Sequence, residues 1–163
     1  MRRGVESCEG CEAVVILLDV NVLVYAQRAD SPEHPMFRQF LDELLNGGRP
    51  FGVPEMVLSS VVRIATQSFQ KPPTTTSDAL EFCLSVRSSP KCHVLFPSEA
   101  HWSIFDRLCR TIKAKGNLVA DAYLAAFAID RGDTWVTADN DFGKFPGLTW
   151  RHPLKGHSIT NPR

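Results

Sequence analysis

The sequence predicts an α/β protein in which helices cover a mainly parallel sheet. Short β-branched runs, typical of buried strands, alternate with longer segments whose apolar residues recur every three or four positions. Alternating elements of this kind form a parallel sheet flanked by helices. The 163 residues suffice for one domain with a sizeable core, and a content of 44% hydrophobic and 22% charged residues is that of an ordinary globular protein.

The first half of the chain begins with a strand pattern. Residues 14–19 form a short β-branched run that ends at a polar break, which predicts a buried strand. Residues 51–53 fit a second short strand. Apolar positions at helical spacing predict three helices in this half, over residues 20–28, 36–46 and 54–69. The Gly47-Gly48 pair ends the second of these helices.

The second half repeats the alternation. Further helices are expected over residues 78–86, 99–113 and 118–130, and further strands over 92–96, 134–137 and 148–150. Asp78, followed by Glu81, resembles a capping box, and Ser98 is a favoured cap for the helix after it. The last of these helices is apolar nearly all round, which predicts a central, buried position.

No linker divides the chain, so a single domain is expected from residue 14 to residue 154. Residues 1–13 are expected to be a disordered N-terminal tail, and residues 155–163 a polar C-terminal tail. Cys8 and Cys11 form a lone CxxC pair in the first tail, without the second pair that a zinc site needs. Acidic and basic residues balance at 18 each, so bulk charge gives no indication of nucleic-acid binding.

The expected location is the cytoplasm. Five cysteines, an odd number with irregular spacing, favour a reducing compartment. The N-terminus lacks the long apolar segment of a signal peptide. No apolar run approaches the ~20 residues of a membrane helix, so we expect no membrane association.

Four aspartates lie at or just past the ends of apolar segments: Asp19, Asp121, Asp139 and Asp141. Each has an ordinary alternative: Asp19 suits a helix cap, and the last two suit an acidic turn. Asp121 could also cap a helix, although Asn117 is the better-placed cap. Burying a carboxylate is costly unless it is paired or bound to a metal, and ligands collect at strand carboxyl ends in open α/β sheets. Clustered oxygen ligands favour Mg²⁺ or Mn²⁺, and such a site suits phosphodiester hydrolysis.

Three segments make the comparison with a family specific. They read LLDVNVLVYA at 17–26, DAYLAAFA at 121–128, and WVTADNDF at 135–142 with FPGL at 145–148. Together they resemble the acidic motifs of PIN-domain nucleases, in particular the VapC-type toxins of bacterial toxin–antitoxin pairs. The resemblance extends over residues 15–154, with the motifs in the family's order.

The resemblance implies a PIN-like three-layer α/β/α sandwich and a Mg²⁺-dependent endoribonuclease, with Mn²⁺ as a substitute. It implies hydrolysis of RNA phosphodiester bonds by a metal-activated water, a cognate antitoxin that blocks the site, and a homodimer. Asp19 and Asp121 take the principal metal-ligand positions. Asp139 fits the fourth acidic position and Asp141 an accessory one, while Asn21 would orient Asp19 or a phosphate.

The chain departs from the family at one point. The family usually carries a glutamate near residues 58–60, where this chain has Leu58-Ser59-Ser60, and Glu55 lies one helical turn earlier on about the same face. A catalytically silent PIN-like module that binds RNA or a partner therefore stays open. A phosphatase with Asp19 as nucleophile is a third possibility, although Asn21 stands where that chemistry usually has a second acid.

Overall fold

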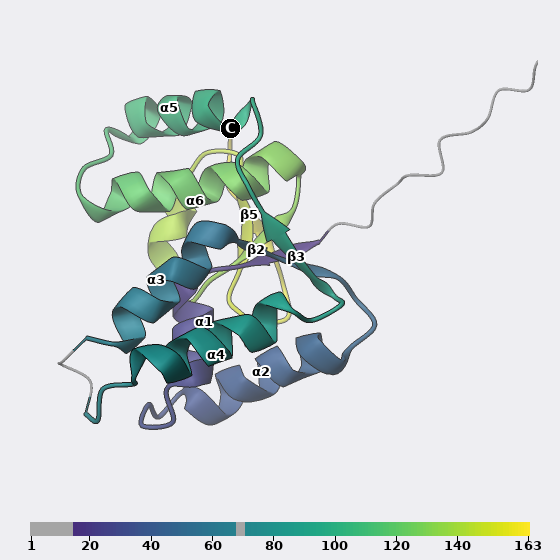
Figure 1. The fold of residues 1–163 in the computed structure, drawn as a ribbon. Helices are drawn as coiled ribbons and strands as arrows, with labels where there is room; N and C mark the ends of the chain where they lie inside the picture. The colour runs from purple at the N-terminus through teal and green to yellow at the C-terminus, as the bar shows by residue number, and fades with distance from the viewer. Residues whose placement is uncertain (1–14, 68–70) are drawn as a thin grey trace, which may run out of the picture.

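The computed structural model describes residues 15–67 and 71–163 (Figure 1). The expected N-terminal tail and its CxxC pair lie outside the described residues. The described chain forms a six-stranded sheet in the order β3-β2-β1-β4-β5-β6. The strands are β1 (Ile16–Leu18), β2 (Phe51–Pro54), β3 (Cys92–Leu95), β4 (Thr134–Val136), β5 (Thr149–Arg151) and β6 (Ile159–Thr160). All neighbouring pairs are parallel except β5 and β6.

Two layers of helices cover this sheet. The helices are α1 (Val20–Gln27), α2 (His34–Asn46), α3 (Glu55–Ala65), α4 (Thr76–Arg87), α5 (His101–Ile112), α6 (Asn117–Arg131) and the 3₁₀ turn η1 (Asn140–Lys144). Helices α1 to α4 lie on one side of the sheet, and the α5–α6 pair lies on the other (Figure 1). The predicted α/β class and its mainly parallel sheet are confirmed. None of the described helices is long and apolar enough to cross a membrane.

The central strands are buried on both faces, as a parallel sheet between two helical layers requires. Leu17 and Leu18 of β1 and Trp135 and Val136 of β4 are fully buried. Gly52 of β2 lies beside Leu17 of the neighbouring strand β1, and a Cβ at this position would overlap the Leu17 side chain. The apolar runs that predicted strands therefore contribute their side chains to one continuous hydrophobic core.

Several helix boundaries differ from the predicted ones. Helix α4 begins at Thr76, two residues earlier than predicted, because its cap is Thr75 and not Asp78, and Thr75 accepts a hydrogen bond from the backbone N–H of Asp78 (3.1 Å). Helix α5 begins at His101, two residues later than predicted, and its cap is Ala100. Ser98, the predicted cap, accepts a hydrogen bond from the Ala100 N–H (3.2 Å) in the turn before the helix. Helix α3 ends at Ala65, earlier than residue 69, although residues 68–70 are outside the described chain.

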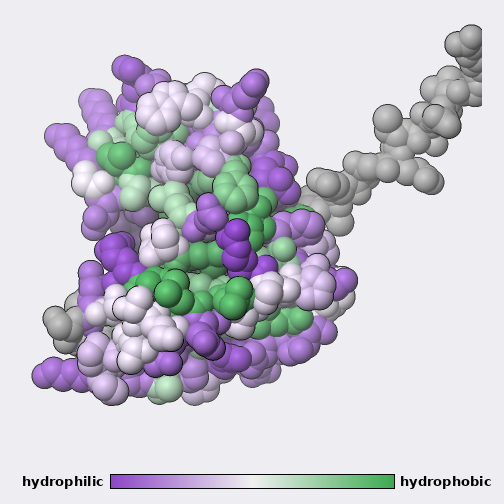
Figure 2. All heavy atoms as spheres, viewed as in Figure 1, coloured by the Kyte–Doolittle hydropathy of each residue, from purple (hydrophilic) through white to green (hydrophobic). Residues whose placement is uncertain are grey.

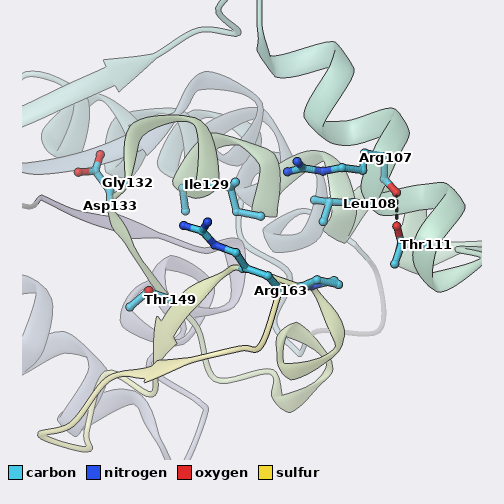
Figure 3. A pocket seen from close by; sticks show the side chains of 11 residues that line it. Arg107, Leu108, Thr111, Ile129, Gly132, Asp133, Thr149 and Arg163 are labelled. Atoms are coloured by element: carbon cyan, nitrogen blue, oxygen red, sulfur yellow. Dashed lines mark hydrogen bonds between the residues drawn. The ribbon is translucent and has the colours of Figure 1, made fainter.

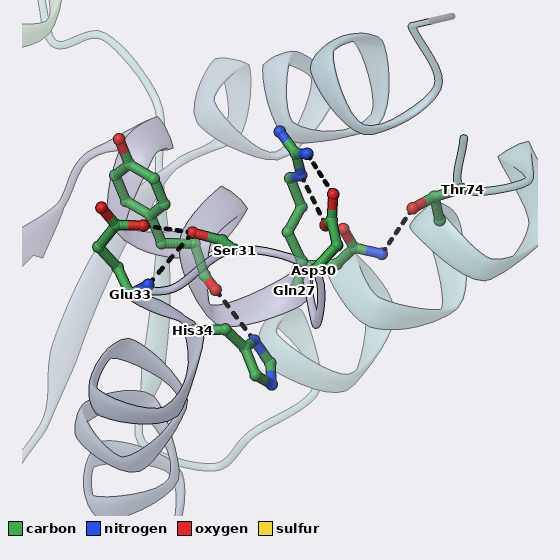
Figure 4. Close-up of polar contacts among 8 residues, drawn as sticks. Gln27, Asp30, Ser31, Glu33, His34 and Thr74 are labelled. Carbon is green, nitrogen blue, oxygen red and sulfur yellow. Dashed lines mark hydrogen bonds and ion pairs between the residues drawn. The ribbon is translucent and has the colours of Figure 1, made fainter. Parts of the chain in front are cut away.

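Polar contacts fix the loop that follows α1, as Figure 4 shows. Arg28 forms an ion pair with Asp30 (2.6 Å), and the His34 ring lies 3.1 Å from the Tyr25 carbonyl oxygen. Gln27 donates to Thr74, which precedes α4 (3.0 Å). These bonds hold the far end of α1, whose other end begins at the candidate site.

The structure differs from the expected polar tail at residues 155–163. Strand β6 pairs with β5, and Asn161 is buried. The Asn161 side chain accepts a bond from Trp150 Nε1 (3.1 Å) and donates to the carbonyl oxygens of Phe142 (3.0 Å) and Phe145 (2.8 Å). Its amide satisfies buried polar groups around η1, so this segment is part of the fold.

Candidate functional site

The four aspartates meet at the carboxyl edge of the sheet, where β1 and β4 lie side by side. The chain leaves β1 toward α1 on one face and reaches β4 from α6 on the other face. This reversal of direction is the position where open α/β sheets bind ligands. Asp19 directly follows β1, and Thr137 and Asp139 follow β4. The Asp19 N–H also donates to the Val136 carbonyl oxygen (3.0 Å), which links the two strand ends.

Asp19 is the most buried acid of the site, with 4% of its surface exposed. Its Oδ1 accepts from the Val20 N–H (2.7 Å), and its Oδ2 accepts from the Thr137 hydroxyl (2.7 Å) and from Asn21 Nδ2 (3.0 Å). Asp19 therefore also caps α1, so its ordinary alternative is correct as well. Its pKa is raised to about 7, chiefly by burial; the hydrogen bonds from Thr137 and Val20 act in the opposite direction, and the charges of Asp121 and Asp139 act in the same direction as burial.

Thr137 and Asn21 connect the two loops that carry the acids. The fully buried Thr137 hydroxyl donates to Asp19 and accepts from Asn21 Nδ2 (3.1 Å) and from the Asp139 N–H (2.9 Å). Asn21 Oδ1 accepts from the Ala138 N–H (3.0 Å). Asn21 is thus in place to orient the Asp19 carboxylate, the position that the sequence motif indicated.

Asp121 contributes a carboxylate from the opposite helical layer. It lies in α6 and is partly buried, and no hydrogen bond to its carboxylate is present in the described chain. Burial raises its pKa to about 6, with the charges of Asp139 and Asp141 acting in the same direction and Lys144 against them. Its position on the helix brings a charge to the site without the partners that the other acids have.

Asp139 and Asp141 belong to the η1 turn that follows β4. Asp139 Oδ1 accepts from the Asp141 N–H (2.8 Å), so the acidic-turn alternative is also correct. Asp141 forms an ion pair with Lys144 (2.6 Å), and this contact raises the pKa of the Lys144 ammonium group. Sequence reasoning did not single out Lys144, although its spacing from Asp141 is that of a helical ion pair.

The donor set is compatible with a hard cation. The four carboxylates, Asn21 and Thr137 all offer oxygen atoms. The repulsion between the carboxylates is what a divalent cation would relieve. In the arrangement found, however, residues 15–67 and 71–163 contain no group of three His, Cys, Asp or Glu side chains close enough to hold a metal ion. Several of the oxygens are already occupied by hydrogen bonds or by Lys144.

Glu55 does not supply the missing glutamate in this structure. Its Oε1 accepts from Arg87 of α4 at 3.0 Å, and both side chains are about half exposed. Its charge is also absent from the interactions that shift the pKa values of Asp19 and Asp121. The acids of the site come from the ends of β1 and β4 and from α6, with none from α3.

A cavity of about 600 Å³ lies at the opposite end of β4, as Figure 3 shows. Arg107 and Arg163 extend toward it. Asp133, which lines it, forms an ion pair with Arg131 (2.7 Å) and accepts from the Val15 N–H (3.1 Å). These contacts give this acid a structural role and separate it from the four aspartates.

The chain matches a known protein family and several of its members. The profile of the PIN domain family matches residues 16–148. The chain is 41% identical over 145 residues to VapC ribonuclease Mb2897 of Mycobacterium bovis, covering 88% of this chain and 99% of that protein. It is 34% identical over 140 residues to ribonuclease VapC25 of Mycobacterium tuberculosis, covering 85% and 99%.

Solved structures share the fold. VapBC2 from Rickettsia felis, bound to a DNA fragment from its promoter, superposes with a TM-score of 0.62 at 20% identity, covering 85% of this chain and 98% of that chain. VapC20 of Mycobacterium tuberculosis, a toxin that cleaves the sarcin–ricin loop, gives a TM-score of 0.60 at 16% identity, covering 78% and 92%. These two likenesses support the fold alone.

Proposed function

Because the chain belongs to the PIN domain family, we propose that it is a Mg²⁺-dependent endoribonuclease and the toxic component of a toxin–antitoxin pair. One observation carries the proposal: two strand ends and α6 bring four aspartates to the reversal point of the sheet, where repulsion and burial raise the pKa values of Asp19 and Asp121. The ribonuclease names of relatives with 41% and 34% identity support the reaction.

Asp19 and Asp121 would hold the cation, with Mn²⁺ as a possible substitute for Mg²⁺. Bound there, the cation supplies polarisation of a phosphate oxygen and a lower pKa for water. Asn21 and Thr137 keep the Asp19 carboxylate in one orientation through the bonds to its Oδ2. Without them, only the bond from the Val20 N–H to Oδ1 would fix the direction of this carboxylate.

Asp139 is the proposed proton acceptor. Its Oδ1 is held by the Asp141 N–H, which leaves Oδ2 to accept a proton from the attacking water. The water oxygen bonds to phosphorus and the bond from phosphorus to the 3′-oxygen breaks. The leaving 3′-oxygen takes a proton from solvent, and Asp139 returns the proton it accepted to solvent. Asp141 and Lys144 form the outer part of the pocket, where the lysine offsets part of the acidic charge.

We also propose the class of substrate and the partner. Single-stranded RNA is the substrate, because a loop or an open strand fits an acidic pocket better than a stacked duplex. A cognate antitoxin blocks the site, a proposal supported by the toxin–antitoxin structures that share the fold. Helices α3 and α4 line a cavity of about 680 Å³, and the side chains of Leu80 and Leu84 on its wall are exposed. Apolar surface of this kind is what protein partners cover. The chain acts in the cytoplasm, as a homodimer.

Cleavage of RNA by the purified protein tests the function. We expect cleavage with Mg²⁺ or Mn²⁺, none with a chelator, and a loss of at least about a hundredfold in Asp19→Asn, since charge-stabilising groups contribute about this much. Addition of the purified antitoxin encoded by a neighbouring reading frame stops the cleavage. Sedimentation of the same samples gives the oligomeric state. Asp106→Asn, an exposed acid paired with Arg110, is the control and keeps full activity.

The alternative function is a silent module that binds RNA or a partner. The absence of an acid from α3 at the site favours it, because Glu55 is held by Arg87. Metal-dependent cleavage that Asp19→Asn abolishes excludes this alternative. Binding without cleavage, in wild type and variant alike, would replace the nuclease proposal with it.

A further inference from the structure

A further cavity opens at the same edge of the sheet as the acidic site. It has a volume of about 350 Å³. Three segments line it: Glu55 and Met56 at the start of α3, Leu95 to Pro97 at the end of β3, and Tyr123 and Phe127 of α6. Figure 2 shows apolar side chains gathered on this face, between the α5–α6 layer and the α3–α4 layer. The cavity therefore lies between the two helical layers, as the acidic site does.

Aromatic rings form much of its wall. Tyr123 and Phe127 each pack on the buried ring of His101, with centroids 4.4 Å apart in both pairs. His101 Nε2 also lies 3.0 Å from the Tyr123 carbonyl oxygen. Phe96, in contrast, is 60% exposed at the mouth. One side of the cavity is thus held in place by packing, and the other offers a free aromatic face.

The cavity is adjacent to the acidic site along the sheet edge. It lies beyond the ends of β2 and β3, and neighbouring strands are ~4.8 Å apart, so it is roughly 7 Å from the end of β1 along the sheet edge. Helix α6 contributes to both places, with Tyr123 and Phe127 about 3 Å and about 9 Å further along its axis than Asp121 and on faces rotated from it by about 120–160°. An RNA chain with one phosphate at the acids can therefore place an adjacent base here.

We propose that this cavity binds one unstacked nucleobase of the RNA and favours bases that carry an amino group. This inference rests on the proposed function, because it takes RNA as the ligand. Proteins read single-stranded RNA by stacking its bases on aromatic side chains, and ~300 Å³ is enough for a small-molecule site. Apolar walls beside the Glu55 carboxylate disfavour a phosphate group. Glu55 Oε1 pairs with Arg87, and its second oxygen accepts from an amino group such as cytosine N4.

Binding of short RNA in a chelator tests the proposal without requiring cleavage. The probes are fluorescent hexacytidylate and hexauridylate, which differ in the amino or carbonyl group of the base, and Kd is read by anisotropy. We expect tighter binding of hexacytidylate by the wild type. Phe96→Ala weakens it about tenfold, equivalent to about 1.4 kcal/mol, within the range of one base stack. Because Phe96 is mostly exposed, this change removes little core packing.

Matched variants distinguish binding in the cavity from nonspecific binding to exposed aromatic side chains. Trp102 is 67% exposed on α5 and does not line the cavity, so Trp102→Ala leaves both Kd values within twofold. Glu55→Gln lowers the preference for hexacytidylate over hexauridylate at least threefold, whereas Arg87→Gln, which breaks the same ion pair, keeps the preference. Replacing single bases by abasic sites weakens wild-type binding at one position most, and Phe96→Ala removes that difference.

The outcomes are distinct from those of the nuclease test. Equal losses in Phe96→Ala and Trp102→Ala, or no loss in Phe96→Ala, overturn the inference. So does a Phe96→Ala protein that binds RNA normally but binds its antitoxin more weakly, because the cavity then belongs to a protein partner. If the protein prefers one base through Phe96 but does not cleave RNA, the base-binding proposal stands and the nuclease proposal fails. If it cleaves RNA and binding does not depend on Phe96, the nuclease proposal stands and the base-binding proposal fails.

Discussion

Asp121→Asn is expected to stabilise the metal-free protein at neutral pH. Burial and the neighbouring acids raise the pKa of Asp121 from 3.8 to about 6. A shift of about 2 pKa units corresponds to at most ~3 kcal/mol of unfolding free energy. Because this carboxylate is only partly buried, solvent screening reduces the figure to about 1–2 kcal/mol. For a chain of this length, that is a rise in Tm of roughly 2–8 °C.

The sign of the pH dependence follows from the direction of the shift. Well below pH 3.8, Asp121 is protonated in both folded and unfolded chains, so wild type and Asp121→Asn differ little. Between about pH 4 and pH 6 the unfolded chain is ionised at Asp121 while the folded chain is still protonated, so a rise in pH favours the unfolded state of the wild type. Its stability relative to the variant therefore falls between pH 4 and pH 6–7, and the difference is constant above that.

Thermal unfolding in a chelator, measured from pH 4 to pH 8, checks this expectation. Millimolar Mg²⁺ is expected to raise the wild-type Tm by mass action, and Asp121→Asn should remove most of that rise. Asp106→Asn is the control, because this acid is exposed and paired with Arg110 outside the site. A variant that is no more stable than wild type at pH 8, or a difference that does not change with pH, would refute the electrostatic reasoning.

The remaining predictions concern the bonds that hold the site and the last strand. Thr137→Val removes the donor to Asp19 Oδ2 and the acceptor for the Asp139 N–H, and should lower the unfolding free energy by about 1–3 kcal/mol in urea titrations. Unchanged stability would show that the Thr137 hydroxyl does not contribute to the free energy of unfolding. Asn161→Ala leaves Trp150 Nε1 and two carbonyl oxygens without partners, and should cost about 3 kcal/mol or more by the same measurement. A change within 0.5 kcal/mol would mean that this segment is dispensable.

Much of the architecture was predictable because its signals are local. The short β-branched runs became β1 and β4, and the apolar periodicity located each helix to within a few residues. The four aspartates were predictable as a group for a similar reason. Asp19 and Asp139 end apolar runs that become neighbouring parallel strands, so their meeting follows from the topology. Asp121 was predictable as a site residue because its neighbours on the helix are apolar and offer its carboxylate no polar partner.

The remainder depends on contacts between distant residues that no local pattern contains. Asn161 reads as part of a polar tail, because its partners are the carbonyl oxygens of η1 and the Trp150 indole. Glu55 shares a helical face with the position of the family glutamate, yet its direction is set by Arg87, 32 residues later. Spacing on one helix gives the face that a side chain occupies, and its partner decides where the charge lies.

The ordinary roles of these acids and their proposed catalytic role depend on the same oxygens. Asp19 caps α1 and receives two further hydrogen bonds, each of which favours its charged form, yet burial prevails and its pKa is about 7. A cap at a solvent-exposed helix end would retain those bonds with little desolvation. The fold therefore places this carboxylate deeper than capping requires, beside two other acids that raise its pKa further. A single helix cap does not account for that position, whereas the divalent cation proposed for this site would.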